Sequence, residues 1–121
     1  MVLDTNILVA YLNGESSVIR FVSGLKQEGR VIFISSISIA EVLALPSLAP
    51  AEIKSIKQFL SEFIYVPFDD VLAETAALIK RFYKLGIPDA AIAATAITRQ
   101  VPLVSRDKQF RKIKELKLVS L

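Results

Sequence analysis

The sequence predicts an α/β protein with a mainly parallel sheet, and three observations support this class. Short, mostly apolar runs of strand length alternate along the chain with longer runs of helical pattern. Apolar residues make up 53% of the 121 positions and charged residues 22%, which excludes a disordered chain and allows a sizeable core. No linker or internal repeat divides the sequence, so we expect one domain over residues 1–121.

The first half of the chain opens on a very short strand, Val2–Leu3, which ends at the carboxylate of Asp4. A later run, 31–35, is mostly apolar and rich in β-branched residues, as expected of a buried parallel strand. Helical patterns bounded by Ser, Gly and Pro fill the other positions. We expect these helices over 6–13, over 16–28, from Ser36 or Ser38 to Leu45, and over 51–63.

The second half repeats the alternation. A strand at 64–67 contains Pro67, which cannot donate a backbone hydrogen bond and therefore favours the edge of the sheet. Asp69 is placed to cap a long helix that ends at Leu85, before Gly86. The remaining expected elements are a helix from Pro88 to about Gln100, a strand at 101–105, a short helix or turn at 107–113 and a last strand at 116–121.

Two residue types are missing, and their absence limits the chemistry. Without histidine or cysteine there is no Ser-His-Asp or Cys-His catalysis, no His-His nuclease and no ordinary zinc site. No apolar run is long enough to span a bilayer, and no basic residue precedes Asp4 as a signal peptide would require. We therefore expect a cytoplasmic protein that does not enter a membrane.

Two acidic residues follow predicted strands. Asp4 comes directly after the first strand, and Asp107 follows the strand at 101–105. Ligands of open parallel sheets bind outside the carboxyl ends of the strands, where the strand order reverses. If these two strands are neighbours at that point, Asp4 and Asp107 emerge side by side, and Ser105 lies next to them.

Two further acidic residues lie in helical patterns. Glu41 falls in the segment 37–45, which is apolar on nearly every side, so we expect a largely buried helix whose carboxylate needs a partner. Asp89 follows Pro88 at the start of a helix rich in small residues, which allows close packing and directs the helix N-terminus into the domain. Each acid also has an ordinary interpretation. Asp4 is a helix cap, Asp89 complements a helix dipole, Asp107 is a turn residue, and Glu41 marks the solvated face of its helix.

If the four carboxylates converge, they need a cation. Two carboxylates about 5 Å apart repel by roughly 3 kcal/mol at an effective dielectric of ~20. An all-oxygen site favours Mg²⁺ or Mn²⁺, which can activate water for phosphodiester hydrolysis. The formal net charge is +3, and without these four acids 15 basic residues face only eight of the 12 acidic ones. A basic body around an acidic focus suits a polyanionic substrate, although +3 is also ordinary for a soluble protein.

Four motifs, in this order and at this chain length, resemble the PIN-domain nucleases, and most closely the small VapC-type toxins of toxin–antitoxin pairs. The resemblance covers essentially the whole chain. The motifs are Asp4-Thr5-Asn6 after a short strand, Ala40-Glu41-Val42 in a helix, the run from Pro88-Asp89 to Ala96, and Ser105-Arg106-Asp107-Lys108-Gln109-Phe110.

The resemblance implies a three-layer α/β/α fold with a five-stranded sheet in the order 3-2-1-4-5, and a Mg²⁺- or Mn²⁺-dependent endoribonuclease. It also implies a homodimer and a cognate antitoxin that blocks the acidic site. Carried over by position, the residues have three roles. The main metal ligands are Asp4, Asp89 and Asp107; Glu41 holds metal-bound water or a second ion; the orienting residues are Thr5, Asn6 and Ser105.

The sequence departs from the family pattern at three positions. Ala40 stands where a Thr often precedes the Glu, Ser105 replaces the more usual Thr, and Gln109 occupies a position that is often acidic. These differences bear on the number of metal ions more than on activity, because all four core acids are present.

There are three alternatives to a nuclease. A haloacid-dehalogenase-type phosphatase needs a second Asp where Asn6 stands, and a response-regulator receiver needs its acid pair after the first strand. The stronger alternative is a PIN-like module that binds RNA or a partner without cleavage. In either PIN-like case the basic residues nearest to Asp107, Arg106 and Lys108, are the candidates for RNA contact, although a solvated charged face explains them as well.

Overall fold

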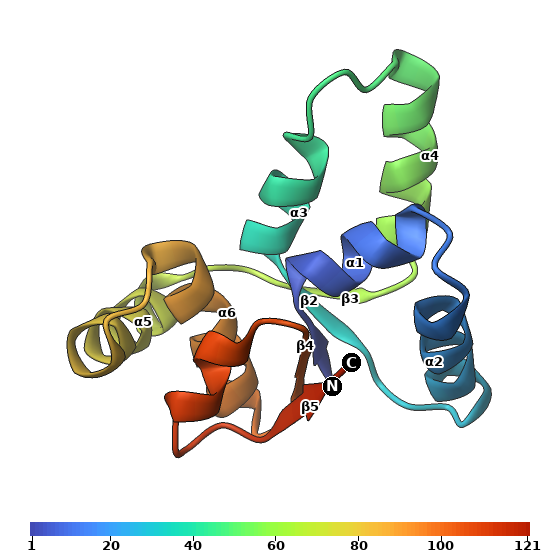
Figure 1. The fold of residues 1–121 in the computed structure, drawn as a ribbon. Coiled ribbons are helices and arrows are strands. Elements are labelled where there is room, and N and C mark those ends of the chain that lie inside the picture. The colour runs from blue at the N-terminus through green and yellow to red at the C-terminus, as the bar shows by residue number, and fades with distance from the viewer.

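A computed structural model describes all residues from 1 to 121, and its centre is a five-stranded sheet (Figure 1). The strand order is β3-β2-β1-β4-β5, and every neighbouring pair is parallel. This confirms the expected fold class and strand order. The strands are β1 (Val2–Leu3), β2 (Phe33–Ser35), β3 (Ile64–Val66), β4 (Leu103–Ser105) and β5 (Leu118–Ser120).

Helices cover both faces of the sheet. Neighbouring residues of one strand point to opposite faces, and accordingly Val2 and Leu3 belong to two different apolar clusters. Helices α5 and α6 pack with Val2, whereas α1, α2 and α4 pack with Leu3. The helices are α1 (Thr5–Leu12), α2 (Ser16–Gln27), α3 (Ser36–Leu43), α4 (Pro50–Leu60), α5 (Asp70–Tyr83), α6 (Ile87–Arg99) and the 3₁₀ helix η1 (Lys108–Lys112).

Several boundaries differ from the predicted ones. The strand expected at 31–35 begins only at Phe33, because β2 pairs with β1 from Phe33 onward, and Val31 is exposed. Helix α5 ends at Tyr83 through a left-handed Lys84 (φ 57°), and Gly86 is the N-cap residue of α6 instead of the end of α5.

Two helices end earlier than predicted. The third helix ends at Leu43 and not at Leu45, because the residue before a proline is disfavoured in helical backbone and Pro46 follows Leu45. The fourth helix includes Pro50 at its first position and ends at Leu60. None of the helices is both long and apolar enough to cross a lipid bilayer.

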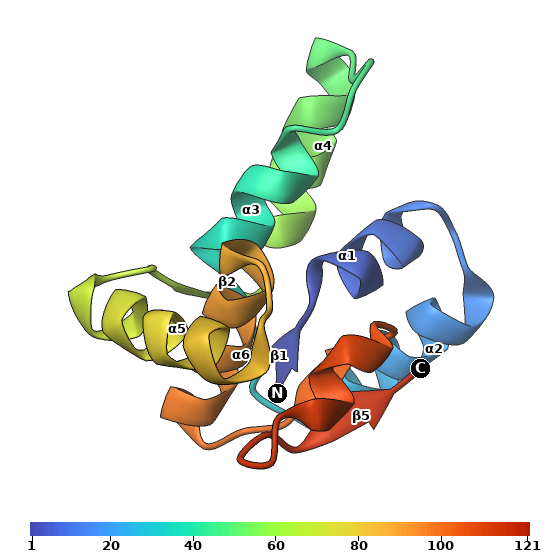
Figure 2. The same cartoon turned by 60° about the vertical axis from the view of Figure 1, so that its left-hand side comes forward.

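Two helices extend beyond the sheet. Figures 1 and 2 show α3 and α4 projecting together past the carboxyl ends of the strands, with the start of α1 at their base. Because β1 and β4 are neighbours, the segments that follow them lie side by side at that edge. The segments after β1 and β4, which carry Asp4 and Asp107, therefore lie at the same edge as helices α3 and α6, which carry Glu41 and Asp89.

Candidate active site

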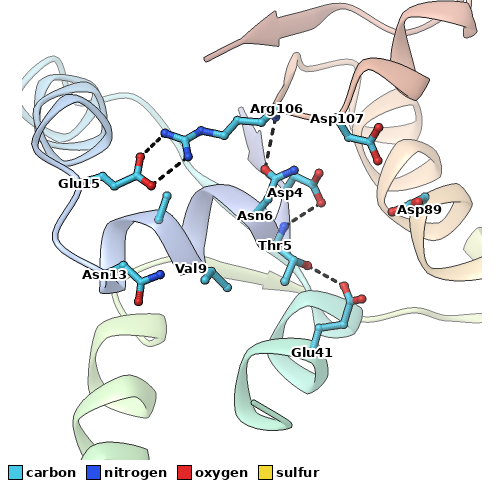
Figure 3. A pocket seen from close by; sticks show the side chains of 11 residues that line it. Asp4, Thr5, Asn6, Val9, Asn13, Glu15, Glu41, Asp89, Arg106 and Asp107 are labelled. Carbon is cyan, nitrogen blue, oxygen red and sulfur yellow. Dashed lines mark hydrogen bonds and ion pairs between the residues drawn. The ribbon is translucent and has the colours of Figure 1, made fainter. Parts of the chain in front are cut away.

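A polar pocket of about 410 Å³ lies at the carboxyl ends of β1 and β4, and all four predicted acids line it (Figure 3). They reach it from different elements: the end of β1, helix α3, the first turn of α6 and the loop after β4. Because β1 and β4 are neighbours, Asp4 and Asp107 come to one edge of the sheet as their strand order predicts, and Glu41 and Asp89 reach the same pocket from two helices. The lining residues are Asp4, Thr5, Asn6, Val9, Ala10, Asn13, Glu15, Glu41, Asp89, Arg106 and Asp107.

Asp4 is the most deeply placed of these carboxylates, with 4% of its surface exposed. Its Oδ1 accepts a hydrogen bond from the Thr5 backbone N–H at 2.7 Å, so Asp4 caps α1 as well as lining the pocket. Burial raises the pKa of Asp4 from 3.8 to about 6, although the hydrogen bonds from Ser105 and Thr5 oppose that rise. Its negative charge is thus costly in the absence of a cation.

Ser105 connects the two strand-end motifs. This fully buried residue donates from Oγ to Asp4 Oδ2 at 2.6 Å, and its Oγ accepts from Asn6 Nδ2 at 3.3 Å and from the Asp107 backbone N–H at 3.0 Å. Asp107 in turn accepts from the Gln109 N–H at 2.9 Å and caps η1. One hydroxyl group therefore fixes the relative positions of Asp4, Asn6 and the Asp107 backbone.

Glu41 lies at the pocket, but the expectation that its helix is largely buried is wrong. Only Ser38 and Val42 of α3 are buried, and Glu41 is on the exposed side because α3 projects beyond the sheet. Its Oε1 accepts a hydrogen bond from Thr5 Oγ1 at 2.7 Å. Glu41 therefore lies on the solvated face of α3, as its ordinary interpretation predicts, and lines the pocket from there.

Asp89 stands in the first turn of α6, half-buried at the pocket. Every residue from Ala90 to Ala96 is buried, as the small residues predict, but Ile87 before them is 45% exposed. The expectation that the N-terminus of this helix points into the domain rather than into water is therefore wrong: the first turn of α6 is open to solvent at the pocket. Burial raises the pKa of Asp89, and the charges of Asp107 and Glu41 raise it further. These carboxylates are close enough to repel one another.

The two basic residues expected near the site differ in position. Arg106 lines the pocket, but its guanidinium is paired with the carboxylate of Glu15 (Figure 3). Lys108 is the first residue of η1; it is exposed and does not line the pocket.

The sequence matches the family model of the PIN domain over residues 1–116. The chain belongs to the PIN domain family. Three solved structures illustrate the likeness. One is a chain in a toxin–antitoxin complex from Klebsiella pneumoniae, which matches at 28% identity and a TM-score of 0.83. The alignment covers 98% of the PIN domain and 95% of that chain.

The other two structures come from DNA-bound VapBC complexes. VapBC2 from Rickettsia felis, bound to a DNA fragment from its promoter, matches at 26% identity and a TM-score of 0.84, covering 99% of the PIN domain and 97% of that chain. VapBC from Salmonella typhimurium matches at 25% identity and a TM-score of 0.84, covering 98% and 96%. Comparison with curated protein sequences gave no significant match.

Two pocket features of this PIN domain are not apparent from the sequence alone. Ser38 is fully buried, and its Oγ lies 2.9 Å from Thr5 Oγ1, so it supports the residue that holds Glu41. Its spacing of three residues from Glu41 on one helix could have indicated this. Glu15 is 91 positions from Arg106, and no local pattern indicates that the two residues meet.

The donor set of the PIN domain fits a hard divalent cation. Its acids offer only oxygen ligands, and the raised pKa values of Asp4 and Asp89 reflect charge that a cation would compensate. No three of the carboxylates stand close enough to bind one ion together in this side-chain arrangement.

Proposed function

We propose that this PIN domain is a Mg²⁺- or Mn²⁺-dependent endoribonuclease that hydrolyses phosphodiester bonds of largely single-stranded RNA in the cytoplasm. The observation that carries the proposal is the convergence of Asp4, Glu41, Asp89 and Asp107 on one open, polar pocket. The resemblance to VapC-type toxins supports a role as the toxin of a toxin–antitoxin pair.

The pocket residues have different proposed roles. Asp4, Asp89 and Asp107 would be the main ligands of the cation once their side chains turn toward it, because no three carboxylates are close enough in the present arrangement, and Glu41 would hold metal-bound water or a second ion. When bound, the cation supplies activation of the attacking water and compensation of charge on the leaving oxygen. The orienting residues are Thr5, which donates to Glu41, and Ser105 with Asn6, which fix the Asp4 carboxylate.

Metal dependence is the direct test of this function. Purified protein, free of any bound antitoxin, is expected to cleave labelled single-stranded RNA with Mg²⁺ or Mn²⁺. Cleavage should stop with chelator and return when excess metal is added, because the acids alone provide no activated water. Gel electrophoresis of the RNA products measures this. Folded protein that binds a varied RNA pool without cutting it would instead support the RNA-binding module.

An apolar groove beside the active site supports the antitoxin part of the proposal. It lies between α1 and α4, and it shares Val9 and Asn13 with the acidic pocket. A partner helix with apolar side chains fits such a groove, and its continuing chain would reach the carboxylates. We therefore propose that an antitoxin binds here and blocks the site. The other apolar residues of the groove are Leu12, Leu45, Leu48, Ala51 and Ile56.

A second exposed surface supports the proposed homodimer. The outer face of α5 carries Val71, Thr75, Leu78 and Phe82, spaced by four, three and four residues as in a coiled-coil seam. Phe82 is 81% exposed, which is unusual for so large an apolar side chain. We propose that this stripe packs against α5 of a second copy.

Charges beside the stripe favour an antiparallel arrangement. Glu74 and Arg81 lie on the same side of α5, seven residues or about two turns apart. An antiparallel copy places Glu74 of one chain opposite Arg81 of the other, and the two-fold axis repeats that pair.

Phe82→Glu is expected to weaken the dimer by at least about tenfold, because each copy loses the burial of a large apolar side chain. Light scattering after size exclusion over a range of concentrations measures the change. Ile64→Glu, at an exposed apolar residue of β3, is the matched control and should leave the dimer intact. A reversed pair, Glu74→Arg with Arg81→Glu, should restore association that Glu74→Arg weakens. A monomeric wild type would contradict the dimer.

A further inference from the structure

An ion pair that the proposed hydrolysis does not use lies at the rim of the acidic pocket (Figure 3). The Arg106 guanidinium donates from Nη1 to Glu15 Oε1 at 3.1 Å and from Nη2 to Glu15 Oε2. Arg106 follows β4, whereas Glu15 is the N-cap residue of α2. The Glu15 side chain makes no capping hydrogen bond to the helix, so its carboxylate serves Arg106 alone.

Arg106 is the one basic residue among the eleven that line this pocket, which otherwise includes five acids. An RNA backbone entering the pocket would therefore meet a single guanidinium. Arginine binds carboxylate and phosphate in the same two-pronged way, through two parallel N–H···O hydrogen bonds. Glu15 thus occupies the position that a phosphate group would take on Arg106.

The geometry of this ion pair allows a phosphate to replace the Glu15 carboxylate on Arg106. The side chains of Arg106 and Glu15 are 36% and 44% exposed, and exposed ion pairs contribute little to stability. In contrast, the Arg106 backbone is held, because its N–H donates to Asn6 Oδ1 at 3.4 Å and the preceding Ser105 is buried. Exchange at the guanidinium therefore requires no change in the fold.

We propose that Arg106 binds an RNA phosphate next to the reacting one, and that Glu15 is a positioning residue that holds the guanidinium until this phosphate displaces it. The proposal rests on the proposed function, since it assumes that RNA enters the acidic pocket. It goes beyond that function by assigning Glu15, a pocket acid outside the four-carboxylate set, to substrate binding.

The test measures binding of a short fluorescent single-stranded RNA by anisotropy. An Asp89→Asn background prevents cleavage, Mg²⁺ is present, and salt is varied between about 50 and 200 mM. Arg106→Gln should weaken binding and reduce the slope of log K against log salt by about 0.7, the value for one phosphate contact on a single strand. An unchanged slope would overturn the phosphate contact.

The Glu15 variants separate displacement from simple charge repulsion. Glu15→Gln should tighten RNA binding by about two- to fivefold, as expected for release of an exposed ion pair. Glu15→Asp keeps the negative charge but shortens the side chain, so it should also tighten binding if displacement limits affinity. Affinity of Glu15→Asp equal to that of the parent protein would show repulsion alone and overturn the role of Glu15.

Kinetics of the active protein provide a second readout. Glu15→Gln should lower KM and leave kcat within about twofold, because it changes binding and not the reacting groups. Failure of this inference is distinguishable from failure of the proposed function. If the active protein cleaves RNA but Arg106→Gln leaves the salt slope of binding unaltered, only the inference is refuted. If the parent protein neither binds nor cleaves RNA, both are refuted.

Discussion

Asp89→Asn is expected to lower the rate of RNA cleavage by on the order of 10³-fold, because a metal ion stabilises such a transition state by several kcal/mol and 1.36 kcal/mol corresponds to tenfold. Asp89 is suited to this test because it makes no hydrogen bond that positions another pocket residue. Burial raises the pKa of Asp89, and the charges of Asp107 and Glu41 raise it further, so its carboxylate interacts with these neighbours through charge. The amide keeps the shape and removes that charge.

A matched control exists on the neighbouring helix. Asp69 is also an acid at a helix start, where its Oδ1 accepts from the Leu72 N–H at 2.9 Å, and it lies outside the acidic pocket. Asp69→Asn should therefore leave the cleavage rate within about twofold of wild type, because it removes no charge from the reacting centre. Rates are compared at saturating Mg²⁺ with folding checked by circular dichroism. Undiminished cleavage by Asp89→Asn would mean that the site or the source of activity is wrong.

The parts of the site that follow from the topology of the sheet are predictable from the sequence. A parallel sheet brings the carboxyl ends of its strands to one edge, so neighbouring β1 and β4 place Asp4 beside Ser105 whatever the loops do. The Ala-rich pattern after Asp89 predicts the close packing that buries residues 90–96, and Asp89 precedes this buried run at the pocket. Sheet topology thus accounts for Asp4 and Asp107, and helix packing accounts for the body of the helix that carries Asp89.

Exposure and element boundaries are not predictable where they depend on how far an element extends beyond the sheet. The pattern around Glu41 is apolar on nearly every side, yet α3 projects past the strands and leaves Glu41 exposed. The strand boundary near Val31 was missed because β2 pairs with both β1 and β3 only from Phe33, and Val31 is exposed. Contacts such as Glu15 with Arg106 join segments whose approach depends on loop geometry that no local pattern describes.

Without metal, the stability of the protein should rise as the pH falls through the pKa of Asp4, the reverse of the usual behaviour of a carboxylate. Burial raises that pKa from 3.8 to about 6, so the folded state binds this proton more tightly than the unfolded chain does. At ~1.4 kcal/mol for each pKa unit, ionised Asp4 costs the fold roughly 3 kcal/mol above pH 7. About 1.4 kcal/mol of this should be recovered by pH 5.

Comparison of wild type with Asp4→Asn isolates this effect. Other groups also titrate, and the lowered pKa of Glu15 acts in the opposite sense, but their contributions are common to both proteins. Chemical denaturation in the presence of chelator should give a free energy of unfolding that rises from pH 7.5 to pH 5 more in wild type than in the variant. If the free energies of unfolding of the two proteins changed equally with pH, ionised Asp4 would not destabilise the fold.

Added Mg²⁺ should then act on the same group. At pH 7.5 the cation is expected to raise the free energy of unfolding of wild type, because it binds the folded state and relieves the charge of buried Asp4. Asp4→Asn should lose most of that gain, since its amide has no charge to offer the cation. Asp69→Asn, away from the pocket, should keep it. Equal stabilisation of wild type and Asp4→Asn by Mg²⁺ would place the cation elsewhere, and the carboxylate that is most costly to bury would then have no role in holding it.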